Sequence, residues 1–228
     1  MASPSIAENV AAVRARIDAA LERAGRSPGD VTLVAVTKTV SAPRVKEAFD
    51  AGICDFGENY LQEAIAKQQD PRLPHGEIRW HFIGHLQHNK VRSALEHFEL
   101  IHSCDSLKLA AELGKRATQV GRVARILLQV RLDPNENRFG IELDKAIDVA
   151  ESVRNVSGVS LEGLMGMAPF GDTAEAARPY FKALSAVFQA IPRDSRKILS
   201  MGMTADFEVA IEEGATLVRI GTALFGAR

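Results

Sequence analysis

The residues Val31-Thr-Leu-Val-Ala-Val-Thr-Lys38 decide the fold of this chain. The run is short and rich in β-branched residues, and it is bounded by Pro28-Gly29-Asp30 on one side and Ser41-Ala42-Pro43 on the other. A short apolar run between turn signals predicts a strand that is buried on both faces, as in a parallel sheet. Lys38 therefore stands at the carboxyl end of a buried strand.

Lys38 has two interpretations, because burying an unpaired ammonium is costly. In the first, its side chain extends to solvent at the rim of the sheet, as many rim lysines do. In the second, its amine is desolvated, which lowers its pKa, or is consumed in an imine. Alternation places Thr32, Val34 and Val36 on one face of the strand, but the sequence does not say which face is interior. The strand alone favours the rim, so the rest of the chain must distinguish the two.

The composition describes an ordinary globular chain of 228 residues, with 46% apolar residues, 25% charged residues and a net charge of −1. Because the net charge is small and no basic stripe is visible, nucleic acid is not an expected partner. No apolar run is as long as a membrane span and no secretory signal opens the chain, so we expect a cytoplasmic protein. Cys54 and Cys104 lack metal or redox spacing, which is typical of a reducing compartment.

Strand-like and helix-like segments alternate along the chain. An amphipathic helix over residues 5–24 comes first and ends at Gly25. Eight strand-like segments follow, and each except the last precedes a helix: 31–38, 53–56, 78–83, 99–103, 125–131, 159–164, 197–200 and 216–220. In this pattern, the helix after the second strand starts at Gly57.

Strict alternation predicts parallel strands with right-handed crossovers. Eight such units with no linker between them predict an α/β fold, a closed (β/α)8 TIM barrel with an extra N-terminal helix, formed by residues 1–228 as a single domain. An open doubly wound sheet is the alternative, but no Gly-x-Gly-x-x-Gly follows the first strand.

The loops after the seventh and eighth strands carry residues that suit a phosphate. Ser200-Met-Gly-Met-Thr204 combines a glycine with a hydroxyl at either end, and Gly221-Thr222 repeats that chemistry after the last strand. Ordinary helix capping explains either loop alone. Barrel enzymes often bind a phosphate at these two positions, next to helix N-termini, so the two loops together favour a ligand.

Arg219 lies inside the last strand and alternates with Val218 and Ile220. If Val218 and Ile220 meet the helices, the guanidinium points into the barrel, where it needs hydrogen-bond acceptors. A structural carboxylate is the common partner of a buried arginine, and a ring nitrogen of a bound cofactor is the alternative.

An amine, a phosphate cradle and an inward arginine together indicate pyridoxal 5′-phosphate (PLP). Lys38 would form the internal aldimine, the two loops would hold the phosphate, and Arg219 would meet the pyridine nitrogen. A cation there opposes protonation of that nitrogen, which weakens the electron sink and disfavours aminotransferase chemistry. A barrel that binds another phosphate ester is the alternative without this cofactor.

Three histidines, His81, His85 and His88, lie close together in residues 80–90. The segment spans a strand end and a helix start and lacks His-Glu-x-x-His, so we predict no metal site. We expect these histidines to line the barrel mouth or to cap the helix that follows.

The segment Trp80-His-Phe-Ile-Gly-His-Leu-Gln-His-Asn-Lys90 resembles the signature of the pyridoxal phosphate homeostasis protein family, small single-domain relatives of the N-terminal barrel of alanine racemase. The similarity extends over nearly the whole length. Further matching segments, in chain order, are Ala35-Val-Thr-Lys-Thr39, Phe56-Gly-Glu-Asn-Tyr60, Gly163-Leu-Met165, Ser200-Met-Gly-Met-Thr204 and Val218-Arg-Ile-Gly-Thr222.

The resemblance implies a fold-type III barrel that binds PLP through a Schiff base on Lys38. The other residues that it assigns to the cofactor are Ser200, Gly221 and Thr222 at the phosphate, Arg219 at the pyridine nitrogen and Asn59 beside the ring. It also implies a role in vitamin B6 and PLP homeostasis, with apo-enzymes that use PLP as candidate recipients, and we expect a monomer. One segment departs from the family: Asn137-Arg-Phe-Gly140 resembles a racemase loop where many members have a lysine, so the role of Arg138 stays open.

A racemase needs a second acid/base on the face of the cofactor opposite the lysine. In the related racemases this is a tyrosine from a separate C-terminal domain of a partner subunit, and we expect no such domain here, because the chain ends shortly after the eighth strand. The sequence contains two tyrosines, Tyr60 and Tyr180, and the second is expected in an outer helix. We therefore favour a PLP carrier without established catalytic activity over a PLP-dependent amino-acid racemase or lyase.

Overall fold

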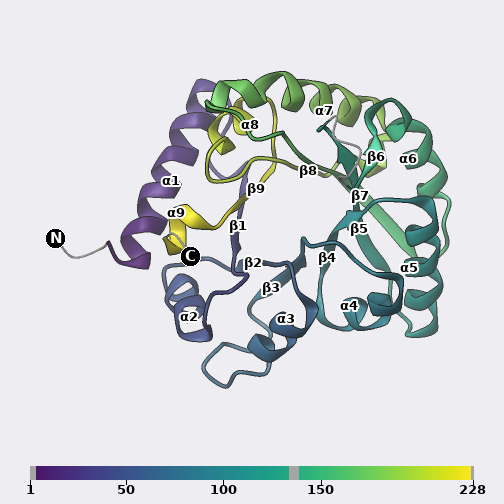
Figure 1. Cartoon of the computed structure of the whole chain (residues 1–228), viewed down its shortest axis with the longest axis horizontal. Coiled ribbons are helices and arrows are strands. Elements are labelled where there is room, and N and C mark those ends of the chain that lie inside the picture. The colour runs from purple at the N-terminus through teal and green to yellow at the C-terminus, as the bar shows by residue number, and fades with distance from the viewer. Residues whose placement is uncertain (1–3, 134–138, 227–228) are drawn as a thin grey trace.

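The strands of this protein form a closed ring in the computed structural model, which describes residues 4–133 and 139–226 (Figure 1). The strands in this part of the chain are β1 (Thr32–Val36), β2 (Asp55–Glu58), β3 (Arg79–Phe82), β4 (Leu100–Cys104), β5 (Ala124–Arg131), β6 (Ile141–Glu142), β7 (Val159–Met167), β8 (Ile198–Ser200) and β9 (Leu217–Ile220). Their hydrogen-bonded order is β4-β3-β2-β1-β9-β8-β7-β5, and β4 pairs with β5 to close the ring. All these pairs are parallel, so the predicted (β/α)8 barrel is confirmed. The short β6 is an unpredicted addition, which pairs with the end of β5.

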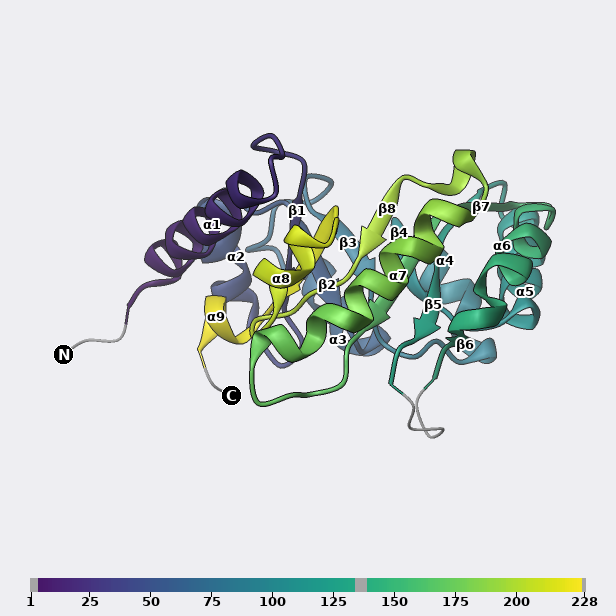
Figure 2. The ribbon, with the colours of Figure 1, turned by 90° about the horizontal axis from the view of Figure 1, so that it is seen from above.

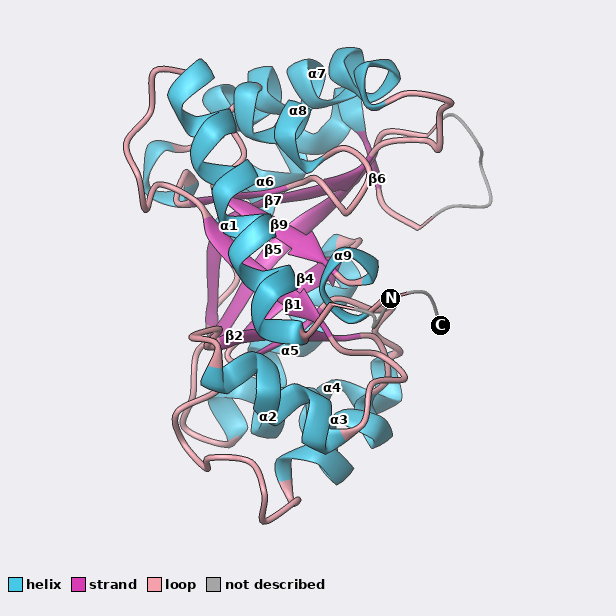
Figure 3. Cartoon of the chain, turned by 90° about the vertical axis from the view of Figure 1, so that its left-hand side faces the viewer, coloured by secondary structure: helices cyan, strands magenta, loops and turns pink. Residues whose placement is uncertain are grey.

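Helices surround the ring of strands. Those in the described residues are α1 (Ile6–Arg23), α2 (Ala42–Asp50), α3 (Leu61–Gln68), α4 (Val91–His97), α5 (Leu107–Gln119), α6 (Ala146–Arg154), α7 (Arg178–Ala190), α8 (Phe207–Glu212) and α9 (Thr222–Phe225). Figure 3 shows the strands in the middle of the molecule, with α7 and α8 on one side and α2, α3 and α4 on the other. None of the helices in this part of the chain is both long and apolar enough to cross a membrane.

The predicted N-terminal helix is present as α1, which packs along the outside of the barrel against α2, α8 and α9 (Figure 2). A capping box fixes its start, because Ser5 Oγ accepts the backbone N–H of Glu8 at 3.2 Å and Glu8 Oε2 accepts that of Ser5 at 2.7 Å. Its buried side chains recur at helical spacing: Ile6, Val10, Val13, Ile17, Ala20 and Leu21.

Strand β2 begins later than predicted and includes Gly57 and Glu58, which the sequence pattern places in a helix. Gly57 pairs with Val36 on one side and with His81 on the other. A Cβ atom on Gly57 would lie 3.0 Å from a side-chain carbon of Val34, so the glycine fits where interior side chains crowd. Pairing with two strands overrides the local helical pattern, and Asn59 consequently follows the carboxyl end of β2.

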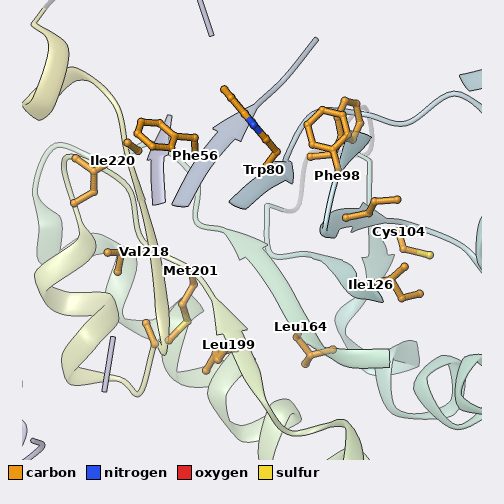
Figure 4. Packing of buried hydrophobic residues seen from close by; sticks show 14 of the residues in the cluster. Phe56, Trp80, Phe98, Cys104, Ile126, Leu164, Leu199, Met201, Val218 and Ile220 are labelled. Atoms are coloured by element: carbon orange, nitrogen blue, oxygen red, sulfur yellow. The ribbon is translucent and has the colours of Figure 1, made fainter. Parts of the chain in front are cut away.

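The hydrophobic core is mainly a shell between the strands and the helices (Figure 4). Val218 and Ile220 belong to this shell, which turns Arg219 into the barrel. Ala35 also belongs to it, so the opposite face of β1, with Val34 and Val36, faces the interior. A small apolar cluster of Leu100, Leu127 and Met165 fills part of the interior. Many of the remaining interior side chains are polar, and they include the residues of the candidate site.

Candidate functional site

A cavity of about 580 Å³ opens at the carboxyl ends of β1, β7, β8 and β9. In an α/β barrel this is the end where the loops carry function. Four of the predicted residues meet there: Lys38, Arg219, Gly221 and Thr222. Thr204 and Asp206 add polar groups, and Phe170, which is 83% exposed, belongs to the wall formed by the loop after β7.

Lys38 follows β1 on its interior face, and its side chain is half-buried in the cavity wall. Its amine has no hydrogen-bond or ion-pair partner among the residues that the structure describes. A lysine that borders a cavity in this way can react with a ligand without first breaking an ion pair. The Lys38 side chain therefore faces the cavity and does not simply extend into solvent.

Arg219 is 4% exposed and reaches the same cavity from the interior face of β9. Its Nη1 donates to Ser200 Oγ at 2.5 Å, and its Nη2 donates to the carbonyl oxygen of Gly166 at 3.1 Å. Burial lowers the pKa of Arg219 to about 10, and the charge of Asp206 partly opposes this shift. No carboxylate in the described residues forms an ion pair with Arg219, and a guanidinium has five N–H donors. Its two protein hydrogen bonds therefore leave donors for a ligand.

Arg219 is one end of a hydrogen-bonded chain that crosses the barrel interior. From Ser200 the chain continues through His102 and His81 to Asp55, and each of these three steps measures 3.0 Å. All five side chains are buried. Arginine only donates and an ionised carboxylate only accepts, so with both histidines neutral every donor points from Arg219 toward Asp55. The chain thus joins a buried cation to a buried anion through neutral groups.

The pKa values of the side chains in this hydrogen-bonded chain agree with that arrangement. Burial lowers the pKa of His102 well below its ordinary value, which keeps its imidazole neutral at pH 7. Burial alone would raise the pKa of the Asp55 carboxyl, but hydrogen bonds from His81 and Arg79 lower it to about 2. Arg79 contacts the two oxygens of Asp55 at 2.8 and 2.5 Å.

We expect Asp55 to make the fold sensitive to acid. Its pKa is about 2 in the folded chain against an ordinary value of 3.8, so its contribution to stability is present above pH 3.8 and is lost as the pH falls toward 2. The shift corresponds to about 2 kcal/mol at neutral pH. Urea unfolding across this pH range should show a steep loss of stability in the wild type and a shallower one in Asp55→Asn.

The matched control for this measurement is Asp70→Asn. Hydrogen bonds from Arg72 lower the pKa of Asp70 to about 2 as well, but this pair lies at the surface, where solvent screens it. Its replacement should change the pH dependence little. Identical pH profiles for the wild type and Asp55→Asn would contradict the prediction.

Two predicted residues, Ser200 and Asn59, lie outside the cavity lining. Ser200 is the last residue of β8, and its fully buried hydroxyl is occupied by Arg219 and His102. Asn59 borders a neighbouring cavity together with Tyr60 and Gly84, and its Oδ1 is buried with no hydrogen-bond partner in the described part of the chain. Cofactor contacts of Ser200 and Asn59 stay predictions, whereas Thr204, the other hydroxyl of the 200–204 loop, borders the cavity itself.

The loops after β8 and β9 are packed against each other. The Thr204 hydroxyl accepts the backbone N–H of Ala223 at 3.5 Å, which joins the two loops. Gly202 has a φ of +91°, and a Cβ there would lie 2.6 Å from the Cβ of Ala210 in α8. The glycine therefore lets the first loop lie close to α8, so that Thr204 and Thr222 reach one cavity.

The three histidines of residues 80–90 lie apart from one another. His81 is in the interior chain, and His85 stacks on Phe139 with ring centroids 3.7 Å apart. His85 Nδ1 also lies 3.5 Å from an oxygen of Asp105, and His88 is exposed at the start of a 3-10 turn. Arg138 lies outside the described residues.

The sequence patterns do not single out His102 or Asp55, two members of the hydrogen-bonded chain that starts at Arg219. Alternation offers a signal for His102, because it shares a face of its strand with Leu100, which is in the interior cluster. Asp55 offers a weaker signal, because the predicted second strand is displaced from the observed one.

The fold and the cavity define a (β/α)8 barrel with a lysine after its first strand and a buried arginine on its last. The family model of the alanine racemase N-terminal domain matches residues 9–228. A pyridoxal phosphate homeostasis protein of Pseudomonas aeruginosa is 44% identical over 227 residues, which cover 98% of this chain and 96% of the relative. Its counterpart in Escherichia coli is 40% identical over 228 residues, which cover 98% of this chain and 97% of the relative.

Solved structures agree with these relatives. PipY of Synechococcus elongatus with PLP bound is similar with a TM-score of 0.83 and 38% identity, covering 97% of this chain and all of PipY, 100%. An alanine racemase of Clostridium difficile has a TM-score of 0.71 at 14% identity, covers 98% of this chain and 57% of the racemase, and shows the fold alone. The chain belongs to the alanine racemase N-terminal domain family and, within it, to the pyridoxal phosphate homeostasis proteins.

Proposed function

We propose that this protein binds PLP in the cavity after β1, β7, β8 and β9 and takes part in PLP homeostasis by holding and releasing it. The observation that carries the proposal is the meeting, in one cavity, of a lysine amine and a buried arginine that have no carboxylate partner among the residues that the structure describes. PipY, which is 38% identical over nearly the whole chain, has been solved with PLP bound, and this supports the same ligand here.

The groups of the cavity suit each part of PLP. When bound, the cofactor supplies an aldehyde that reacts with amines and a pyridine ring that withdraws electrons. Lys38 offers the amine, and Arg219 offers N–H donors for the ring nitrogen. Gly221 and Thr222, together with Thr204, offer backbone and hydroxyl groups to the phosphate, at the place where barrels commonly bind one. Ser200 supports Arg219 from below the cavity.

The tyrosines of the chain favour a carrier over a racemase or lyase. A racemase needs a second acid/base on the face opposite the lysine. Tyr60 is 59% exposed and borders the neighbouring cavity, whereas Tyr180 is on α7 and packs against the outer core. Neither tyrosine lines the cavity of Lys38.

The visible spectrum tests the proposal most directly. The purified protein should absorb visible light after incubation with PLP, and borohydride should make the adduct permanent, with peptide mapping locating it on Lys38. Addition of an apo-enzyme that requires PLP should then decrease this absorbance as the acceptor gains activity.

The same samples separate the alternatives. A colourless protein that still binds phosphate esters would mean that the cavity takes another ligand of that class. Racemisation or elimination of a single-enantiomer amino acid, lost in Lys38→Ala, would establish an enzyme in place of a carrier. PLP that never reaches an acceptor would contradict the release step.

A further inference from the structure

We propose that Lys67, with Glu58 and Glu63, is a positioning cluster that holds the backbone on both sides of Lys38 and so keeps the Lys38 amine in the cavity. The inference rests on the proposed function of Lys38 as the cofactor's anchor. None of the three residues borders that cavity, so they affect the cofactor only through the residues that they hold.

Lys67 is a buried lysine, 6% exposed, on the inner side of α3. Its ammonium contacts the carbonyl oxygen of Thr37 at 2.5 Å, Glu58 Oε1 at 2.6 Å and Glu63 Oε1 at 2.7 Å. A lysine ammonium has three donors, so these acceptors use all of them. One of the three acceptors is the backbone of the residue directly before Lys38.

The two carboxylates of the cluster hold the neighbours of Lys38 independently. The Thr37 hydroxyl donates to Glu58 Oε1 at 2.6 Å, and the Thr39 backbone N–H donates to Glu63 Oε1 at 2.5 Å. Thus residues 37 and 39 are both tied to one cluster, while the side chain of the residue between them points into the cavity. The cluster draws on β2 and α3, so it fixes the turn after β1 against two other elements.

The backbone at Thr39 shows that this turn needs such support. Its φ is +61°, and it is the one non-glycine residue with positive φ in the described ranges. A β-branched residue adopts this conformation only when the surrounding structure imposes it. The hydrogen bond to Glu63 is one such constraint, because it fixes the direction of the Thr39 N–H.

The composition of the cluster also indicates that it positions the turn after β1 more than it stabilises the fold. Glu58 is fully buried, and its Oε2 has no hydrogen-bond partner in the described part of the chain. Burial raises the pKa of Glu58, with Lys67 opposing the shift. A buried ion cluster is a poor source of net stability compared with apolar side chains of the same size. Its specific hydrogen bonds, by contrast, fix the geometry of the turn.

The test compares PLP release from four purified proteins: the wild type, Lys67→Met, Glu63→Ala and Lys46→Met. Lys67→Met removes the central cation at similar length. Glu63→Ala is the milder variant, because it removes the acceptor of the Thr39 N–H at a partly exposed position of α3, and it keeps the fold if Lys67→Met does not. Lys46→Met is the matched control, because Lys46 pairs with Asp50 at the surface of α2, 2.6 Å apart, and touches neither the turn nor the cavity.

Release is followed by the decay of the visible band after dilution into excess acceptor, and the pH at which that band titrates is measured in parallel. We expect release to accelerate on the order of tenfold in both cluster variants, and the titration of the band to shift, because a misplaced amine reacts less favourably. Lys46→Met should match the wild type in both measurements.

Unchanged release and titration in folded Lys67→Met or Glu63→Ala would overturn the positioning role. A lower melting temperature with unchanged release would show that the cluster stabilises the fold only, which also overturns it. The proposed function fails separately, and the positioning role with it, if the wild type forms no adduct at Lys38.

Discussion

Lys38→Ala should abolish the covalent attachment of PLP and leave the protein colourless. Lys38 is the one lysine that borders the cavity among the described residues, and its half-buried amine has no partner in that part of the chain, so we expect no other lysine to take its place. A covalent bond formed inside a site benefits from a very high effective concentration. Retention of PLP should therefore fall by roughly two orders of magnitude or more once that bond cannot form. Gel filtration after PLP loading, with the absorbance of the protein peak, measures retention.

Two controls separate covalent attachment from charge. Lys38→Arg keeps a cation at the same place but cannot form the bond, so it should fail like the alanine variant. Lys90→Ala removes a lysine from the neighbouring cavity and should retain PLP like the wild type. A borohydride adduct of normal yield in Lys38→Ala would place the anchor on another lysine.

The stretch around Lys38 also shows which features of the structure the sequence could predict. Period-two alternation separates the faces of residues 31–38, and the shell position of Ala35 then identifies the interior face. The same reasoning on the last strand correctly directs Arg219 inward, because its neighbours Val218 and Ile220 are apolar. These predictions succeed because strand periodicity is a local property that the fold preserves.

Ser200 shows where such reasoning ends. The predicted seventh strand ends at Ser200, as β8 (Ile198–Ser200) does, but the sequence also counts the Ser200 hydroxyl among the groups of the following loop that suit a phosphate. The hydroxyl instead belongs to the barrel interior, one layer below the cavity that Thr204 reaches. Which side chains such a hydroxyl meets depends on the relative stagger of the strands around the barrel, which local alternation does not give.

The hydrogen-bonded chain from Arg219 to Asp55 could not be predicted for a related reason. His102 and Ser200 are 98 residues apart, and His81 and His102 are 21 apart. Whether they meet depends on the relative stagger of strands around the closed ring, a property of the whole sheet. The role of Lys67 is not visible in the sequence, because its i,i+4 spacing from Glu63 resembles that of an ordinary surface pair, whereas its buried contact with Glu58 depends on the position of β2.

Arg219→Met should retain Lys38 attachment but release PLP faster than the wild type. Methionine keeps much of the buried volume and removes every N–H donor, so the ring nitrogen would lose its proposed partner. A hydrogen bond to a charged group contributes about 1.5–3 kcal/mol, which corresponds to roughly 10- to 100-fold in retention. Dissociation into excess apo-enzyme measures the change, and the melting temperature reports whether the fold survives.

Ser200→Ala gives this prediction its internal comparison. It removes the hydroxyl that accepts from Arg219 Nη1 and interrupts the path to His102, but it leaves the guanidinium and its bond to Gly166 in place. Release should therefore accelerate less than in Arg219→Met. If folded Arg219→Met released PLP at the wild-type rate, Arg219 would be a structural residue. Its hydrogen bonds to Ser200 and Gly166 would then serve the barrel interior and not the ligand.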